Sequence, residues 1–318
     1  MTPEELLNTI RAFQESRALL TAIEFDLFTY IAGGATAAQV AARITADPRA
    51  TEMLLDALTA MEVLEKRGGV YRNSPLAAEQ LTGDARMALM HQVHLWRRWS
   101  TLTECVRKGT SVTRDEPRTP DSTEAFIAAM HRNATTRAPE VVKVVDASKV
   151  RRMLDVGGGS GAYSIAFARA NPELEAELLD LPTVVPIASR HIAAAGLEGR
   201  VRLRSGDLKR DDFGSGFDLV LLSAICHMLS VDENRNLLAR CAGALRHGGR
   251  IVIQDFVLDP DKTSPRFAAL FSLNMLVGTE RGASYSEPEY RAWLQEAGMR
   301  EVTRIDLQGG PALMIGTK

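Results

Sequence analysis

The first half of the chain, to about residue 140, carries apolar residues at helical spacing. The segment FQESRALLTAIEFDLFTYI (13–31) is amphipathic and alanine-rich, and no strand-like alternation occurs before about residue 60. Next come TAAQVAARI (36–44), DPRATEMLLDALTAMEVL (47–64) and EKRGGVYRN (65–73), which predict a short helix, a capped longer helix and a hairpin. That order is typical of a winged-helix unit. This half is therefore predicted to be mainly α-helical.

Two later stretches complete the first half. Residues 85–108 form another long helical pattern that contains Trp96 and Trp99. The segment SVTRDEPRTPDS (111–122) is the most linker-like stretch of the chain. We place the boundary between the two predicted domains at residues 145 and 146.

After about residue 148 short apolar runs alternate with helical segments, which predicts an α/β domain with a mostly parallel sheet. The strand candidates are RRMLDV (151–156), AELLDL (176–181), VRLRSG (201–206), FDLVLLSAI (217–225), RIVIQDFV (250–257), EVTRIDL (301–307) and ALMIGT (312–317). The helices predicted between them are SIAFARANP (164–172), PIASRHIAAAG (186–196), NRNLLARCAGALRHGG (234–249) and EPEYRAWLQEAG (287–298). Ser286 begins a capping box for the last helix, which ends at Gly298.

Composition narrows the class of protein. The 318 residues carry a formal net charge of −2, and the basic runs at 97–99 and 150–152 are too short to bind a nucleic-acid backbone. No apolar run approaches the roughly 20 residues of a membrane-spanning helix, and TPEELL after Met1 does not resemble a signal peptide. The three cysteines imply neither a disulfide framework nor a zinc site. We expect a cytoplasmic protein without nucleic acid, membrane or metal as partners.

The loop LDVGGGSGAYS (154–164) lies between a predicted strand and a predicted helix, where glycine lets a ligand approach the backbone. Two ligands compete for it. Gly157, Gly159 and Ala162 loosely satisfy the dinucleotide pattern G-x-G-x-x-G/A, with Asp180 near the position of a ribose-binding acid. An NAD-dependent dehydrogenase is therefore one interpretation.

Asp155 favours the other ligand. Its carboxylate, two residues before the first glycine, could meet a cationic group or fix the glycine turn, whereas a pyrophosphate would be repelled by it. S-adenosylmethionine carries an amino group, a sulfonium, a ribose and an adenine, and Asp180 could accept hydrogen bonds from the ribose hydroxyls.

Five motifs together resemble one family in order and spacing. They are D-V-G-G-G-S-G (155–161), L-L-D-L-P (178–182), S-G-D-L (205–208), A-I-C-H (224–227) and V-I-Q-D-F-V (252–257). This set resembles the class I O-methyltransferases of the plant caffeate and bacterial polyketide or phenazine type, and the likeness extends over the winged-helix half. It implies a Rossmann-like domain that binds S-adenosylmethionine, with S-adenosylhomocysteine as product, and a homodimer through the N-terminal domain.

The resemblance also implies a cofactor site at the strand ends. The methionine end would meet Asp155, Gly157 and Gly159, the ribose would meet Asp180 and Leu181, and the adenine would lie between Asp207 and Leu208. Acids after strands are also common helix N-caps, which is the alternative for Asp180 and Asp207. Ser223 stands where the family often has a lysine, so one cofactor contact is altered.

His227 is the predicted general base. A phenol with a pKa near 10 is protonated at neutral pH, and histidine with a pKa near 6.5 can accept its proton. Family members commonly continue with aspartate and tryptophan or tyrosine, but Met228 and Leu229 follow here. The resemblance implies Asp255 as the orienting acid. For a second acid, Glu280 is the candidate from one alignment, while the other places Ser284 there.

The resemblance further implies an acceptor site lined by Met130, Phe271, Asn274 and Met275, although helical spacing alone would make these residues core. The predicted function is O-methylation of a small, aromatic, phenolic or polyketide-like hydroxyl compound. Methylation at nitrogen or carbon by the same fold is an alternative. A cofactor-binding winged-helix regulator is another, but its predicted DNA-reading helix offers Arg49 as its only basic residue.

Overall fold

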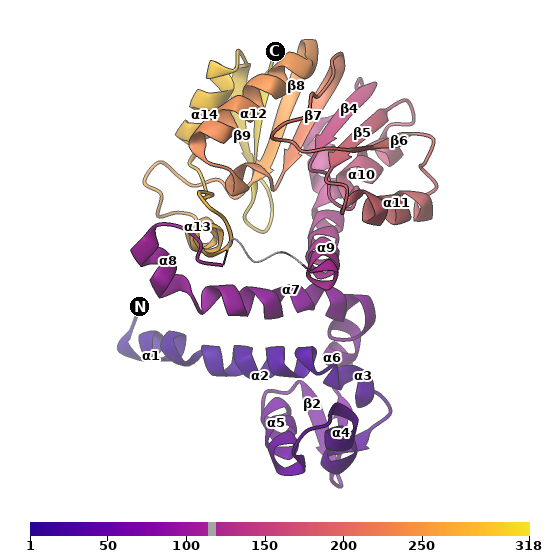
Figure 1. Cartoon of the computed structure of the whole chain (residues 1–318), viewed down its shortest axis with the longest axis vertical. Helices are drawn as coiled ribbons and strands as arrows, with labels where there is room; N and C mark the ends of the chain where they lie inside the picture. Colours follow the sequence, from indigo (N-terminus) through magenta and orange to yellow (C-terminus); the bar gives the residue numbers. More distant parts are fainter. Residues whose placement is uncertain (114–118) are drawn as a thin grey trace. The chain divides into compact units, whose positions relative to one another are not determined.

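The computed structural model describes residues 1–113 and 119–318, so residues 114–118 of the predicted linker lie outside the described residues. The chain divides into two compact units, one of residues 1–97 and 120–129 and one of residues 98–119 and 130–318 (Figure 1). The boundary predicted at residues 145 and 146 lies at the end of helix α9 (Pro120–Val145), whereas the two units divide within α9, between residues 129 and 130.

The first unit is mainly helical. Its elements are α1 (Pro3–Arg11), α2 (Phe13–Glu24), α3 (Leu27–Tyr30), β1 (Ala35–Thr36), α4 (Ala37–Ile44), α5 (Pro48–Ala60), β2 (Leu64–Arg67), β3 (Val70–Asn73), α6 (Pro75–Gln80) and α7 (Gly83–Trp99). The predicted winged-helix order of α4, α5 and the β2–β3 hairpin is confirmed. Thr36 and Asp47 cap α4 and α5 through their side-chain oxygens. The small sheet also includes β1, which the sequence did not predict.

The long helix predicted over residues 85–108 is interrupted. Helix α7 ends at Trp99 and α8 (Leu102–Lys108) follows, and between them the hydroxyl of Thr101 donates to the carbonyl of Arg98 at 2.7 Å.

The second unit is built on a seven-stranded sheet. Its remaining elements are β4 (Arg152–Val156), α10 (Ala162–Ala170), β5 (Glu175–Asp180), α11 (Val185–Ala194), β6 (Val201–Ser205), β7 (Phe217–Ser223), the short 3₁₀ helix η1 (Cys226–Met228), α12 (Val231–Ala244), β8 (Leu245–Asp255), α13 (Arg266–Gly278), α14 (Glu287–Glu296), β9 (Arg300–Asp306) and β10 (Ala312–Thr317). All seven predicted strands are confirmed.

The strand order is β6-β5-β4-β7-β8-β10-β9, with β4 to β8 parallel and β10 antiparallel to both β8 and β9. The order reverses at β4, which pairs with β5 on one side and β7 on the other. In open α/β sheets, ligands bind at the carboxyl ends of the strands beside such a reversal. The loops after β4, β5 and β7 meet there.

Helices cover both faces of this sheet, as Figure 1 shows. Alternate strand residues such as Leu154 and Val220 pack with α12 and α14, whereas Met153 and Leu219 pack with α10, α11 and the end of α9. This alternation is the period of two of a β-strand. Both faces are buried, which explains why the central strands read as continuous apolar runs.

Two predictions at this level need correction. Helix α12 ends at Ala244 rather than at Gly249, because Leu245 already pairs with Phe217 of β7 as the start of β8. Helix α13 is absent from the helices predicted by the sequence, since its residues are apolar nearly all round and give little helical periodicity.

Candidate functional site

The loop after β4 depends on glycine. Gly157, Gly159 and Gly161 have φ angles of 70°, 58° and 81°, a region that residues with a Cβ rarely adopt. A Cβ on Gly157 would also lie 2.4 Å from Cδ1 of Ile225 and 3.8 Å from Cδ2 of Leu208. Both the backbone and the neighbouring side chains therefore require glycine at position 157.

Asp155 lies one residue before the end of β4, beneath this loop, and is fully buried. Its Oδ2 accepts a hydrogen bond of 2.7 Å from Oγ of Ser164, while its Oδ1 has no partner among the described residues. Burial raises the pKa of Asp155 to about 6, and the hydrogen bond from Ser164 opposes that shift. A Cβ on Gly158 would lie 2.8 Å from Cγ of Asp155, so the carboxyl group also supports the turn.

Asp180 ends β5 and holds the same loop from the other side. Its two oxygens accept hydrogen bonds of 2.7 Å from the backbone N–H groups of Gly159 and Leu181. Burial raises the pKa of Asp180, and these two bonds oppose the shift. Each carboxylate oxygen has a second acceptor position, so Asp180 can also bind hydroxyl groups of a ligand.

Asp207 and Leu208 follow β6. The Asp207 carboxylate accepts a hydrogen bond of 2.8 Å from the N–H of Lys209, and its N–H donates to Asp211 at 2.6 Å. The side chain of Leu208 is half-buried beside Gly157. The structure thus brings residues predicted for the adenine end to the edge of the glycine loop.

Ser223 ends β7 and belongs to a polar network that the sequence did not reveal. The hydroxyls of Ser223 and Tyr163 both donate to Oε1 of Gln254 at 2.8 Å, and Gln254 is 2% exposed. The pairing of β7 with β8 places Ser223 beside Gln254, and Tyr163 reaches them from α10. The glutamine within the apolar run of β8 was the one available signal.

His227 lies in η1, just past the end of β7, and is 5% exposed. Its Nδ1 is 2.6 Å from Oδ1 of Asp255 at the end of β8. The backbone N–H of His227 donates to Oδ2 of the same carboxylate at 3.1 Å. The carboxylate therefore fixes both the ring and the backbone of His227.

Asp255 has two further donors. The N–H of Phe256 donates to Oδ1 at 2.8 Å, and the hydroxyl of Tyr290 donates to Oδ2 at 3.1 Å. Burial, with the charge of Asp255, raises the pKa of Tyr290 well above its usual range, so Tyr290 remains a donor. Four hydrogen-bond donors thus contact the two oxygens of this buried carboxylate.

The two positions that the alignments offer for the second acid, Glu280 and Ser284, lie differently. Glu280 is exposed, and its carbonyl accepts a hydrogen bond of 3.0 Å from Oγ1 of Thr110. Ser284 is 4% exposed, and its Oγ has no hydrogen-bond partner among the described residues. The carboxylate of Asp255 contacts the His227 ring. A role for Glu280 stays a prediction.

The predicted acceptor-site residues have different surroundings. Phe271 in α13 contacts His227 edge to face, with 4.8 Å between ring centres. Asn274 accepts a hydrogen bond of 2.9 Å from Nε1 of Trp99, and Met275 is 7% exposed in the same helix. Met130 in α9 is half-buried. The structure thus brings Phe271 to the predicted base.

Phe271 belongs to an aromatic cluster that the sequence did not identify. The ring of Phe256 lies 4.5 Å from that of Phe271 and 4.8 Å from that of Phe267, between ring centres. Phe267 is 53% exposed although it is a large apolar residue. The cluster therefore extends from the buried histidine towards solvent.

A pair of histidines supports the glycine loop. His131 in α9 stacks on His191 in α11, with ring centres 3.9 Å apart, and its Nδ1 lies 2.8 Å from Oγ of Ser160. Burial lowers the pKa of both histidines, and the charge of Arg190 adds to the effect on His191. Two stacked imidazoles cannot both become cationic without repulsion.

We expect this pair to make the protein less stable in mild acid. A histidine whose pKa is lowered by folding contributes stability that is complete above about pH 6.5 and is lost as pH falls below it. The stability lost between pH 7 and pH 5 should therefore be smaller in the double variant His131→Gln, His191→Gln. Urea denaturation at both pH values measures it. The raised pKa of Asp155 changes stability with pH in the opposite direction. Both proteins contain Asp155, so its contribution cancels when their stability losses are compared. Equal losses would contradict the expectation.

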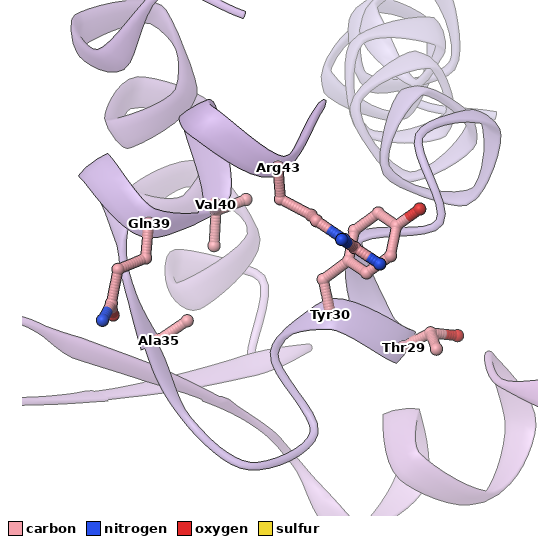
Figure 2. Close-up of a pocket in the computed structure, with 6 residues that line it drawn as sticks. All are labelled: Thr29, Tyr30, Ala35, Gln39, Val40 and Arg43. Atoms are coloured by element: carbon pink, nitrogen blue, oxygen red, sulfur yellow. The ribbon is translucent and has the colours of Figure 1, made fainter. Parts of the chain in front are cut away.

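A separate pocket of about 490 Å³ lies in the first unit (Figure 2). It is lined by Thr29, Tyr30, Ala35, Gln39, Val40 and Arg43. The guanidinium of Arg43 lies over the ring of Tyr30, 5.0 Å from its centre. None of these residues belongs to the predicted site.

The fold and the site define a class. A parallel sheet with a final antiparallel strand pair, a glycine loop after β4 and acids at the ends of β4 and β5 form a Rossmann-like methyltransferase domain of class I. The O-methyltransferase domain family matches residues 105–300, and the O-methyltransferase dimerisation domain family matches residues 7–83. The chain belongs to the O-methyltransferase family and is an S-adenosylmethionine-dependent methyltransferase.

Individual relatives match over nearly the whole chain. The 3-hydroxy-5-methyl-1-naphthoate 3-O-methyltransferase of Streptomyces sahachiroi is 37% identical, over 99% of this chain and 95% of the relative. The N,N-dimethyltransferase OxyT of Streptomyces rimosus is 33% identical, over 98% and 96%. The structure of human N-acetylserotonin methyltransferase in complex with S-adenosylmethionine matches with a TM-score of 0.86 and 27% identity, over 99% and 97%. Among the described residues, no helix is long and apolar enough to cross a membrane.

The residues present fit this cofactor. Asp155 offers a buried oxygen without a partner, Asp180 offers free acceptor positions, and Gly157 leaves space that a Cβ would fill. These features suit a ligand with an ammonium group and ribose hydroxyls.

The winged-helix unit matches a dimerisation domain, and the one basic residue of α5 is Arg49, so a DNA-reading function gains no support.

We expect Gly157→Ala to weaken binding of S-adenosylhomocysteine by roughly 10-fold or more, because the methyl group would meet Ile225 and the backbone would be strained. Calorimetric titration measures the affinity. Gly196→Ala is the matched control, since Gly196 has a φ of 67° but no atom within 4 Å of an added Cβ. Unchanged affinity in Gly157→Ala would show that the loop tolerates a side chain there.

Proposed function

We propose that the protein transfers a methyl group from S-adenosylmethionine to the hydroxyl of a small aromatic, phenolic or polyketide-like compound, with His227 as general base. The observation that carries this proposal is the contact of 2.6 Å between Nδ1 of His227 and Oδ1 of Asp255 at the carboxyl edge of the sheet. It supports a base held in one orientation next to the aromatic ring of Phe271.

The hydrogen bonding determines which nitrogen can act. Asp255 as a carboxylate only accepts, so Nδ1 of neutral His227 carries the proton and Nε2 keeps its lone pair. Nε2 can therefore take the proton of an acceptor hydroxyl. The resulting imidazolium would lie against a buried carboxylate, where the attraction is stronger than in water.

The remaining work of the protein is alignment. Bound S-adenosylmethionine supplies a methyl group already activated by its sulfonium and leaves as S-adenosylhomocysteine. We assign Asp155, Gly157 and Gly159 to its methionine end and Asp180 with Leu181 to its ribose. Asp207, Leu208 and Ser223 complete the set. Orienting the two reactants is the larger contribution to such a displacement.

The acceptor class follows from the site and the relatives. Phe271 contacts His227, and we assign Met130, Asn274 and Met275 to the same acceptor site. The naphthoate and acetylserotonin enzymes are named for acceptors with aromatic hydroxyls, which supports an aromatic acceptor here. We also propose that the chain forms a homodimer through its N-terminal unit, since residues 7–83 match the dimerisation domain.

Methylation at nitrogen is the second candidate, because OxyT is named as an N,N-dimethyltransferase. Incubation with cofactor carrying a labelled methyl group, and with a panel of phenols, hydroxynaphthalenes, flavonoids, polyketide cores and the matching aryl amines, tests both. Our proposal predicts label in aryl methyl ethers. Label only in the amines would favour the second candidate.

A further inference from the structure

Arg137 has a surrounding that the proposed reaction leaves unexplained. It lies in α9, in the second unit, and is half-buried. Within the described ranges its guanidinium makes no hydrogen bond and no ion pair, and its one specific contact is with the face of Phe256, 5.6 Å from the ring centre. Half-buried arginines normally pair with a carboxylate or a carbonyl oxygen.

This guanidinium lies close to the reacting group. Phe256 directly follows Asp255 in the chain, and its ring centre is 6.5 Å from that of His227. The charge of Arg137 also acts on Tyr163 in α10, because burial raises the pKa of Tyr163 and this charge opposes the shift. The cation is thus placed beside the aromatic cluster of Phe256, Phe267 and Phe271, at the side of the proposed base.

Contact with an aromatic face does not use the hydrogen-bond donors of a guanidinium. Arginine has five N–H donors in a planar fork that matches a carboxylate. Asp255 at the end of β8 is not the partner of this guanidinium, because its carboxylate already binds His227 and Tyr290. The donors of Arg137 therefore remain available to an anion. An acceptor that carried its own carboxylate on the aromatic ring would supply the missing partner.

We propose that Arg137 is a specificity-determining residue that binds the carboxylate of the methyl acceptor, so that the acceptor class is the hydroxyaryl carboxylic acids. This inference rests on the proposed function, since it assigns the cluster around His227 to the acceptor. The other available carboxylate is that of the cofactor, and the experiment separates the two sources.

The experiment measures binding without catalysis. The wild-type enzyme saturated with S-adenosylhomocysteine is titrated calorimetrically with a methoxynaphthoate and with its uncharged methyl ester. The same titrations are made with Arg137→Gln, with Arg137→Lys and with Arg132→Gln as a control. Arg132 lies in the same helix and is exposed. Affinity for S-adenosylhomocysteine is measured separately for each protein.

We expect the wild type to bind the acid roughly 10- to 100-fold more tightly than the ester, as a charge-assisted hydrogen bond provides. Arg137→Gln should abolish this preference, Arg137→Lys should keep part of it, and Arg132→Gln should leave it unchanged. Equal binding of acid and ester by the wild type, or a preference that survives in Arg137→Gln, would overturn the inference. Weaker binding of S-adenosylhomocysteine by Arg137→Gln would also overturn it, by assigning the arginine to the cofactor.

The two proposals can fail separately. A preference for the acid that depends on Arg137, in an enzyme that methylates no phenol of the panel, would refute the proposed reaction and retain the inference. Methylation of neutral phenols, with no preference for binding the acid over the ester, would retain the proposed reaction and refute the inference about Arg137.

Discussion

Replacement of His227 by alanine should lower kcat for a phenolic acceptor by roughly 10²- to 10⁴-fold at neutral pH, the usual contribution of a positioned base. The loss has a limit, because alignment of the acceptor with an activated methyl group does not depend on the imidazole. Binding of S-adenosylhomocysteine should remain, since the glycine loop is held by Asp180 and not by His227. Steady-state kinetics and calorimetry measure the two quantities.

The matched control for this variant is His247→Ala, which removes an exposed histidine from β8 of the same unit. It should leave kcat unchanged. Wild-type turnover in His227→Ala, with a phenol as acceptor, would exclude His227 as the base.

The second large effect is expected for Asp255→Asn. The new amide can donate to Nδ1 of His227, which would move the imidazole proton to Nε2 and remove the lone pair that the mechanism needs. We expect kcat to fall by roughly 10²-fold or more. The protein should also be less stable by about 1–3 kcal/mol, because the buried N–H groups and Tyr290 would lose a charged acceptor.

Asp255 acts through His227, so the two effects should not add. The double variant His227→Ala, Asp255→Asn should turn over no more slowly than His227→Ala alone. Asp306→Asn, which changes an exposed acid in β9, serves as the control for stability. Additive losses of kcat in the double variant would mean that Asp255 acts on the reaction independently of the histidine.

The sequence predicted the second unit well because each strand is buried on both faces and gives an apolar run, as in FDLVLLSAI. It failed where tertiary pairing overrides local pattern. Residues 245–249 continue the periodicity of α12, yet the pairing of Leu245 with Phe217 draws them into β8. The β1 strand has only two residues, too few for a pattern.

The site was predictable where residues fall at strand ends, since the parallel sheet brings those ends to one edge. Asp155, Asp180 and His227 are of this kind. The contacts of Arg137 with Phe256 and of His131 with His191 join elements far apart in the chain, so no local spacing reveals them. The same limit applies to the position of the second acid. Glu280 is exposed and Ser284 is buried, and no local spacing in the sequence reveals this difference.

The central claim is that His227 removes a proton from an aromatic hydroxyl. The direct test is the ratio of kcat in wild type to kcat in His227→Ala, measured as a function of pH with two phenols that differ in hydroxyl pKa. A phenol that is already ionised needs no base, so the ratio should fall towards one as pH rises above the pKa of each acceptor, and at lower pH for the more acidic phenol. A ratio that stays constant with pH and is the same for both phenols would contradict the claim.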